Sequence, residues 1–527
     1  MKALSRFFRN ILYLICSVVF LQFSINTPAQ NLKKPLLMAH YMPWFQTKEQ
    51  SGYWGWHWTM NHYDPGKFDS SGKREIASHY YPLTEPYDSR DPHILEYQVL
   101  LMKLSGIDGV LVDWYGDEDY KDYGVLNKST AAIFSWIKKA NLKFAIVYED
   151  QTIQNMIYGG RITSSSAISY GTRAVDYLSS TWFNTDAYLK IENRPVLLVF
   201  GPQYFKKSSD WETIFGSINP KPLFFTEDNY LSPVGAGAYP WPPMWKSNSG
   251  GILTQASLND YLTQFYQKAS SWNYKIGSAF PEFHDIYKEA GVGSGYGFLD
   301  SQNGATFSST LEMAVNQNCD VIQLVTWNDY GEGTIIEPTV EFGYKYLEKV
   351  LEVKKLLIDQ LFTFTKSDLE LPLRIFKLRK AFPTSSSFNL SLDRAFNFLI
   401  LGEAQKAKGI IDSLTLSTNT EEENVPDGFR LFQNYPNPFN PETTISYTIP
   451  SNLPDGKAGV KGETINVTLK VYDVLGREVT TLIDEYKSPG IYNSQFSIRN
   501  SPFASGVYFY TLSSKGYTQT KSMLLIK

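Results

Sequence analysis

The stretch IDGVLVDWY at residues 107–115 decides the fold class, because its apolar run ends abruptly at an acid followed by two aromatic residues. Seven further short apolar runs lie between residues 36 and 329, and most are separated by segments with the apolar spacing of amphipathic helices. These runs are 36–44, 143–150, 195–201, 222–228, 234–240, 275–283 and 321–329. Strands that alternate with helices imply a parallel sheet buried on both faces, and eight such units favour a (β/α)8 TIM barrel over an open sheet.

The barrel prediction makes a specific statement about polar residues, because the C-terminal ends of the strands face the active site of such a barrel. Acidic or aromatic residues close at least six of the eight runs. They are Tyr41, Trp44, Asp113, Trp114, Glu149, Asp228, Glu282 and Asp329. Helix capping by Asp accounts for about two or three of these positions. The sequence therefore predicts a catalytic cleft at this end of the barrel.

Asp329 and Glu332, in TWNDYGEGTIIEP (326–338), are the candidate catalytic residues. Hydrolysis of a glycosidic bond needs a proton donor and a second carboxylate that acts as base or nucleophile. Burial and aromatic neighbours can keep such a donor protonated. Taken alone, the motif fits a polar loop or a metal site as well as it fits catalysis.

Aromatic residues make up 15% of the chain, and many lie beside Gly, Pro and Asp. Flat rings with polar edges suit sugars, although core packing explains most of them. The segment GYWGWHW (52–58) with His62 is expected to form a wall of the cleft, and no metal or other cofactor is expected there. The predicted substrate-binding residues are Tyr41, Trp44, Trp56, His62, Asp113, Trp114, Glu149, Asp228, Glu282, Trp327, Asn328 and Tyr330.

The charge and the N-terminus narrow the class of protein. The net charge is −4 at a pI of about 6.0, so nothing favours nucleic-acid binding. Three basic residues precede the apolar run ILYLICSVVFLQF, and small residues follow near position 29. This pattern predicts a signal peptide at residues 1–29. Its apolar run is too short for a stable membrane span. Only Cys319 remains after its removal, so no intramolecular disulfide is expected.

The rest of the chain divides by composition. Residues 30–350 carry the barrel pattern, and residues 351–413 are expected to form a helical appendage. A polar linker is predicted at 414–428. From 429 to 527 short alternating runs separated by turns predict an Ig-like β-sandwich.

The sequence of the C-terminal region is distinctive. FRLFQNYPNPFNPETTISYTIP (429–450), VYDVLGREV (471–479) and SGVYFYTL (505–512) resemble the type A sorting domain of type IX secretion. The resemblance implies type IX secretion machinery as a partner and a Bacteroidetes-type bacterium. It also implies a protein that is secreted or attached to the cell surface. A generic Ig-like or carbohydrate-binding module is the alternative.

The barrel region resembles glycoside hydrolase families 71 and 99. The resemblance rests on HYMPWF (40–45), YPLTEPYDSRDP (81–92), GIDGVLVDWYG (106–116) and NDYGEGTIIEP (328–338). Family 99 contains the endo-α-mannosidases, which are (β/α)8 barrels, and family 71 contains α-1,3-glucanases. The resemblance implies an endo-acting enzyme that hydrolyses α-linked polysaccharide, either α-mannan or α-glucan.

Family 99 ends its eighth strand with Asn-Glu-x-x-Glu-Gly-Thr, in which both Glu residues are catalytic. By that resemblance Glu332 is the general acid/base, and Asp329 replaces the Glu that deprotonates the 2-hydroxyl of the sugar. Asp is one methylene shorter than Glu. The sequence Trp-Asn-Asp-Tyr-Gly-Glu (327–332) instead resembles the corresponding motif of family 71. The alternative is a carbohydrate-binding barrel at the cell surface in which this change has impaired catalysis.

Overall fold

The computed structural model describes most of the chain after the predicted signal peptide. The described residues are 34–419, 429–434, 436–450, 464–488, 490–498, 504–514 and 516–526. The predicted signal peptide and most of the predicted linker lie outside them. The chain forms two compact units: one contains the residues up to Asp91 and Ser105–Thr363, and the other contains Pro92–Leu104 and the residues from Phe364 onward.

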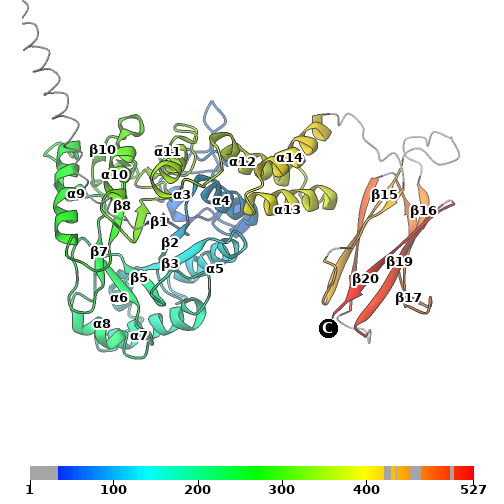
Figure 1. Ribbon diagram of the computed structural model, residues 1–527, viewed down its shortest axis with the longest axis horizontal. Coiled ribbons are helices and arrows are strands. Elements are labelled where there is room, and N and C mark those ends of the chain that lie inside the picture. The colour runs from blue at the N-terminus through cyan, green and yellow to red at the C-terminus, as the bar shows by residue number, and fades with distance from the viewer. Residues whose placement is uncertain are drawn as a thin grey trace, which may run out of the picture. The chain divides into compact units, whose positions relative to one another are not determined.

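The first unit is built on eight parallel strands, which follow one another around the sheet in the order β7-β6-β5-β3-β2-β1-β11-β8 (Figure 1). Their bounds are β1 (Leu36–Tyr41), β2 (Gly109–Trp114), β3 (Lys143–Tyr148), β5 (Arg194–Val199), β6 (Leu223–Glu227), β7 (Gly237–Tyr239), β8 (Ile276–Ala279) and β11 (Val321–Leu324). The end strands β7 and β8 lie in contact, so the sheet is a nearly closed barrel. The predicted TIM-barrel fold is confirmed.

Burial explains why these segments form barrel strands. All six residues of β2 are buried, and so are five of the six in β1 and in β3. A strand that is buried on both faces has to be covered by side chains on both sides, which is the environment of a barrel strand. In β4 (Lys190–Ile191), which pairs antiparallel with β5, neither residue is buried.

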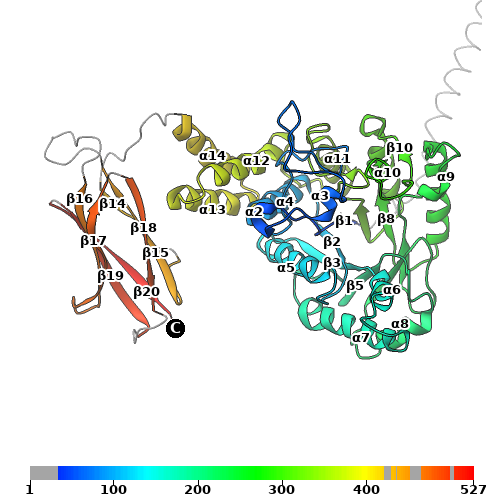
Figure 2. The same ribbon diagram turned by 180° about the vertical axis from the view of Figure 1, so that it is seen from behind.

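Helices surround the strands, as Figures 1 and 2 show for α5, α7, α9 and α10. The buried residues of α5 include Leu126, Ile133 and Ile137, whose spacing gives one apolar face. The helix α9 begins at an N-cap, Thr254, whose side chain accepts a hydrogen bond from the N–H of Ser257. The helices of this unit are α2 (Lys48–Ser51), α3 (Trp56–Thr59), α5 (Tyr123–Lys139), α6 (Gln151–Tyr158), α7 (Ala167–Leu178), α8 (Ser208–Ile214), α9 (Gln255–Ala269), α10 (Ala305–Val315) and α11 (Lys345–Val353).

The predicted strand at 321–329 is too long. Strand β11 ends at Leu324, and Asp329 instead belongs to a short hairpin of β12 (Asn328–Asp329) and β13 (Thr334–Ile335). Gly333 in its turn has φ +70, a conformation that glycine adopts without strain. Asp329 therefore lies beyond the eighth strand, and the prediction that it ends this strand is wrong.

In the second unit, α4 (Pro92–Ser105) groups with α12 (Leu371–Ala381), α13 (Ser386–Ile400) and α14 (Ala404–Asn419). Arg379 of α12 forms a bidentate ion pair with Glu96 of α4, with N···O distances of 2.8 and 2.9 Å. Arg379 also bonds to Asp393 of α13, so one guanidinium connects three helices.

The C-terminal strands form two antiparallel sheets, in the orders β14-β15-β18 and β17-β16-β19-β20. Alternate residues of β16 point inward, including Val467 and Leu469, and they pack with Ile445 and Tyr510 from other strands. The predicted sandwich is confirmed. The strands are β14 (Arg430–Leu431), β15 (Glu442–Ile449), β16 (Ile465–Tyr472), β17 (Glu478–Lys487), β18 (Gly490–Ser497), β19 (Gly506–Ser514) and β20 (Tyr517–Leu525).

In the parts of the chain that the structure describes, no helix combines the length and the apolarity needed to cross a membrane.

Candidate active site

A cavity of about 230 Å³ lies at the C-terminal ends of the barrel strands. Its wall combines four acids with aromatic rings, and none of its lining residues is Lys or Arg. The lining residues are His40, Met42, Trp44, Trp56, His57, Asp113, Tyr115, Glu149, Phe200, Trp241, Tyr287, Asp329 and Glu332. The four acids therefore share a small cavity with no Lys or Arg side chain in its wall.

The cavity unites six of the predicted site residues: Trp44, Trp56, Asp113, Glu149, Asp329 and Glu332. The other eight predicted residues do not line it. They are Tyr41, His62, Trp114, Asp228, Glu282, Trp327, Asn328 and Tyr330.

Asp329 and Glu332 are held close together by the hairpin turn. The N–H of Glu332 donates to Asp329 Oδ1 at 3.0 Å. Burial raises the pKa of Asp329 to about 6, while the N–H groups of Glu332 and Gly331 oppose that rise. Burial raises the pKa of Glu332 well above its usual range, and the charge of Asp329 raises it further. The two acids thus differ in their environments: Asp329 loses its proton first and Glu332 keeps its own.

Asp113 and Glu149 form a second pair of acids in the wall. Asp113 Oδ1 is buried and has no hydrogen-bond partner. Burial raises the pKa of both side chains well above the usual range, and each feels the charge of another cavity acid. Buried polar atoms normally have partners, so Asp113 Oδ1 is suited to bind a hydroxyl of a ligand.

Glu227, at the end of β6, was missed by the sequence prediction, which selected Asp228 instead. Burial raises the pKa of Glu227 to about 7, and its charge raises the pKa of both Glu149 and Glu332. Asp228 has φ +56 and does not line the cavity, and its carboxylate accepts a hydrogen bond from the Tyr261 hydroxyl. The alternation of side chains along β6 is the signal that could have separated the two.

Two histidines also line the cavity: His57 belongs to the segment 52–58 that was expected to form its wall, whereas His40 was not predicted. The His40 ring lies edge-on to Trp241 at 4.8 Å, and its Nε2 is buried without a partner. The His57 ring stacks on Trp44 at 4.0 Å. Burial lowers the pKa of His40 to about 4 and that of His57 to about 3, so both rings are neutral and do not balance the acids.

Three predicted contact residues instead support the hairpin. The side chains of Trp327 and Tyr330 donate to the buried carboxylate of Glu337, at 3.2 and 3.0 Å. The amide of Asn328 bonds to both the N–H and the carbonyl of Met42, at 2.9 and 3.0 Å. These bonds fix the hairpin that carries Asp329.

The remaining predicted residues have other surroundings. Glu282 accepts hydrogen bonds from the hydroxyls of Tyr80 and Tyr346, at 2.8 and 3.2 Å. Trp114 is buried and donates to Asn127 at 3.0 Å. Tyr41 is fully buried, and His62 is exposed.

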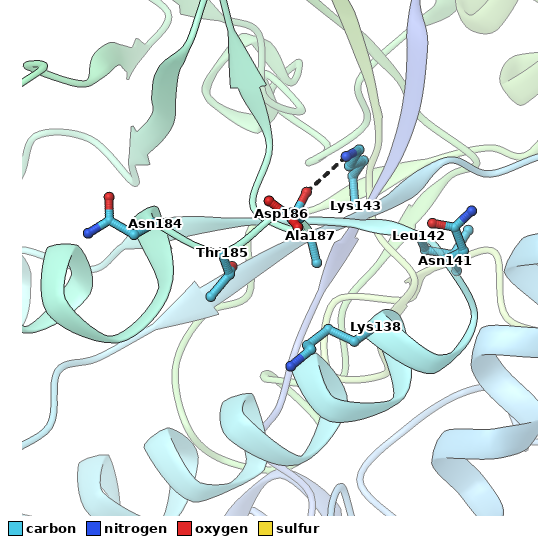
Figure 3. Close-up of a pocket in the computed structure, with 8 residues that line it drawn as sticks. All are labelled: Lys138, Asn141, Leu142, Lys143, Asn184, Thr185, Asp186 and Ala187. Carbon is cyan, nitrogen blue, oxygen red and sulfur yellow. Dashed lines mark hydrogen bonds between the residues drawn. The ribbon is translucent and has the colours of Figure 1, made fainter.

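A wider hollow of about 470 Å³ lies at the opposite end of the barrel, where β3 begins at Lys143 (Figure 3). Lys143 donates to the carbonyl oxygen of Asp186 across it, at 3.0 Å. Asp186 is the one acid among its lining residues. This hollow lacks the cluster of acids and the aromatic rings that line the first cavity.

A TIM barrel with clustered acids, no Lys or Arg beside them in the cavity wall, and aromatic rings at the strand ends is an arrangement typical of glycoside hydrolases. Within the described part of the chain, no group of three or more His, Cys, Asp or Glu side chains could hold a metal ion.

Comparisons with known proteins agree with this class. The secretion system C-terminal sorting domain matches residues 433–527, so the predicted sorting domain is confirmed. A glycoprotein endo-α-1,2-mannosidase-like protein of Danio rerio is 23% identical over 348 residues, which cover 60% of this chain and 74% of the relative. The glycoprotein endo-α-1,2-mannosidase of Mus musculus is 23% identical over 345 residues, covering 58% and 68%.

Among solved structures, the GH99 endo-α-mannosidase from Bacteroides thetaiotaomicron matches 67% of this chain and 100% of its own, with 20% identity and a TM-score of 0.45. The predicted resemblance to family 99 is confirmed by the relatives, which are glycoside hydrolases. Together with the sorting domain they support a secreted glycosidase.

Proposed function

We propose that this protein is a secreted, endo-acting glycoside hydrolase that cleaves α-mannosidic bonds in polysaccharide, with Glu332 as proton donor and Asp329 as the second catalytic carboxylate. One observation carries the proposal: the two acids share a hairpin and a cavity, yet only Asp329 receives N–H bonds from that hairpin. This difference gives one protonated and one ionised carboxyl group at the same pH, as the reaction requires.

In this mechanism Glu332 donates its proton to the leaving glycosidic oxygen. Ionised Asp329 accepts a proton from a sugar hydroxyl or a water, or attacks the sugar itself. Glu332, now ionised, then acts as base in a second step or recovers its proton from solvent. The negative charge of ionised Asp329 stabilises the positive charge that develops on the sugar ring.

The wall also supplies groups for holding the sugar. Trp44, Trp56 and Trp241 offer faces for the CH groups of a ring. Glu149, Asp113 Oδ1 and His40 Nε2 offer acceptors or donors for hydroxyls, and the last two lack protein partners. The names of the relatives, endo-α-1,2-mannosidases, favour an α-mannoside over the α-glucan that the sequence leaves open.

The test is to incubate the full chain with α-mannan and with α-1,3-glucan and to follow the product anomers by NMR. We expect new reducing ends from α-mannan and none with Glu332→Gln. Cleavage of α-1,3-glucan alone would refute the substrate assignment. Binding without cleavage of either polysaccharide would instead support a catalytically impaired carbohydrate-binding barrel.

A further inference from the structure

The glycine-rich segment GVGSGYG (291–297) carries an aromatic side chain, Tyr296, that has no role in the proposed mechanism. Tyr296 is 63% exposed, whereas the Tyr287 side chain beside it lies in the cavity wall. The two rings meet edge to face with centroids 5.8 Å apart. The ring of Tyr296 thus lies at the rim of the cavity, with most of its surface open.

The backbone of this segment is fixed by Asp285. One carboxylate oxygen of Asp285 accepts the N–H groups of Tyr296 and Gly297, at 2.7 and 3.2 Å. The other accepts the N–H of Tyr287 at 3.1 Å. Gly295 has φ +75, and a Cβ there would lie 2.9 Å from the same carboxylate. Asp285 therefore positions the Tyr296 ring relative to Tyr287.

The same strip of chain also holds the hairpin that carries Glu332. The N–H of His284 donates to the carbonyl of Glu332 at 2.8 Å, and the N–H of Ile286 donates to the carbonyl of Gly331 at 3.0 Å. The charge of Glu332 contributes, after burial, to a raised pKa of Tyr296. Tyr296 is therefore on the Glu332 side of the cavity.

We propose that Tyr296 is a specificity-determining residue that stacks against the sugar of the leaving group. The inference rests on the proposed function. Because Glu332 donates its proton to the leaving oxygen, the leaving sugar has to lie on the Glu332 side of the scissile bond. A sugar that leaves the cavity on that side meets the open ring of Tyr296, and aromatic faces pack well against the CH face of a sugar.

The test compares Tyr296→Ala with the matched control Tyr296→Phe in the full chain. Each is assayed on an α-mannooligosaccharide, whose leaving group is a sugar, and on the α-fluoride of the same glycone, whose leaving group is fluoride. We expect Tyr296→Ala to lower kcat/KM about tenfold on the oligosaccharide and to leave the fluoride unchanged. Tyr296→Phe keeps the ring and should match wild type on both.

Equal losses on the two substrates, or no loss on the oligosaccharide, would overturn the role of Tyr296 while the activity itself stands. A wild-type protein that cleaves neither substrate would overturn the proposed function, and with it the role of Tyr296.

Discussion

Buried acids in two regions of this protein have opposite surroundings. Glu96, in the helical part of the second unit, is 2% exposed and receives two hydrogen bonds from Arg379. Asp113 and Asp329, in the barrel cavity, are 2% and 3% exposed and have no cationic side chain in the wall around them. Burial is the same in both places, so burial does not distinguish a site from a structural contact. The absence of a cationic partner is what distinguishes the acids of the site from the structural acid.

The largest expected effect is on catalysis. Glu332→Gln removes the proton donor and should lower kcat/KM on α-mannan by ~10⁴. Glu282→Gln is the matched control, because Glu282 is a buried glutamate whose carboxylate accepts hydrogen bonds from two tyrosine hydroxyls. Reducing-end assays measure the activity of both variants. An equal loss of kcat/KM for Glu332→Gln and Glu282→Gln would contradict the contrast between the cavity acid and the hydrogen-bonded acid.

The next largest effect is on stability, in the second unit. Arg379→Ala leaves Glu96 buried without its cation and should lower the free energy of unfolding by about 3–5 kcal/mol. Lys408→Ala is the control, since its ion pair with Asp412 is half-exposed and should contribute under ~0.5 kcal/mol. Urea denaturation followed by circular dichroism measures both. Similar values for the two variants would mean that the Glu96 pair does not hold the helices together.

Asp329→Asn should lower kcat/KM by at least ~10² if this side chain acts as base or nucleophile. The substitution keeps the shape of the side chain and its position in the hairpin. Steady-state kinetics on the same substrate as for Glu332→Gln measures the effect. A rate near that of wild type would remove Asp329 from the mechanism.

The pH dependence follows from the raised pKa of Asp329, about 6. Below that pH the side chain is protonated and inactive as a base, so kcat/KM should rise about tenfold per pH unit up to pH ~6. Ionised Asp329 also destabilises the fold, because its pKa is raised above the unfolded value of about 4. The stability of Asp329→Asn relative to wild type should therefore increase from pH ~4 to pH ~6 and stay higher above pH ~6. A flat profile of kcat/KM from pH 4 to pH 7 would contradict this assignment.

The smallest effect on catalysis is expected from truncation after residue 428, which removes the sandwich. Activity should stay unchanged, while export by the type IX secretion machinery should be lost. Culture-supernatant and cell-surface assays measure export. Loss of activity in the purified truncated protein would show that the sandwich takes part in catalysis or folding of the barrel.

The fold was predictable because barrel strands are buried on both faces and their apolar runs are easy to detect. The proximity of Asp329 and Glu332 was also predictable, since a three-residue spacing across glycines brings both residues to one turn. The direction of each side chain near a strand end was not. Asp228 was selected, whereas Glu227 is the acid whose charge reaches Glu149 and Glu332, and the side chains of Trp327 and Tyr330 donate to Glu337.

Other contacts depend on chain segments that are far apart in the sequence. His40 meets Trp241 through packing that no local sequence pattern encodes. The hydrogen bonds that separate the environments of Asp329 and Glu332 also come from the hairpin geometry.

The most direct test of the central claim is the leaving-group dependence of the Glu332→Gln variant. A glycosyl fluoride needs little protonation of its leaving group, whereas a glycan needs a proton donor. The kcat/KM values of wild type and variant, which report the step in which the leaving group departs, should differ by ~10⁴ on α-mannan and by less than about tenfold on the matching α-fluoride. An equal loss on both substrates would contradict the assignment of Glu332 as the general acid.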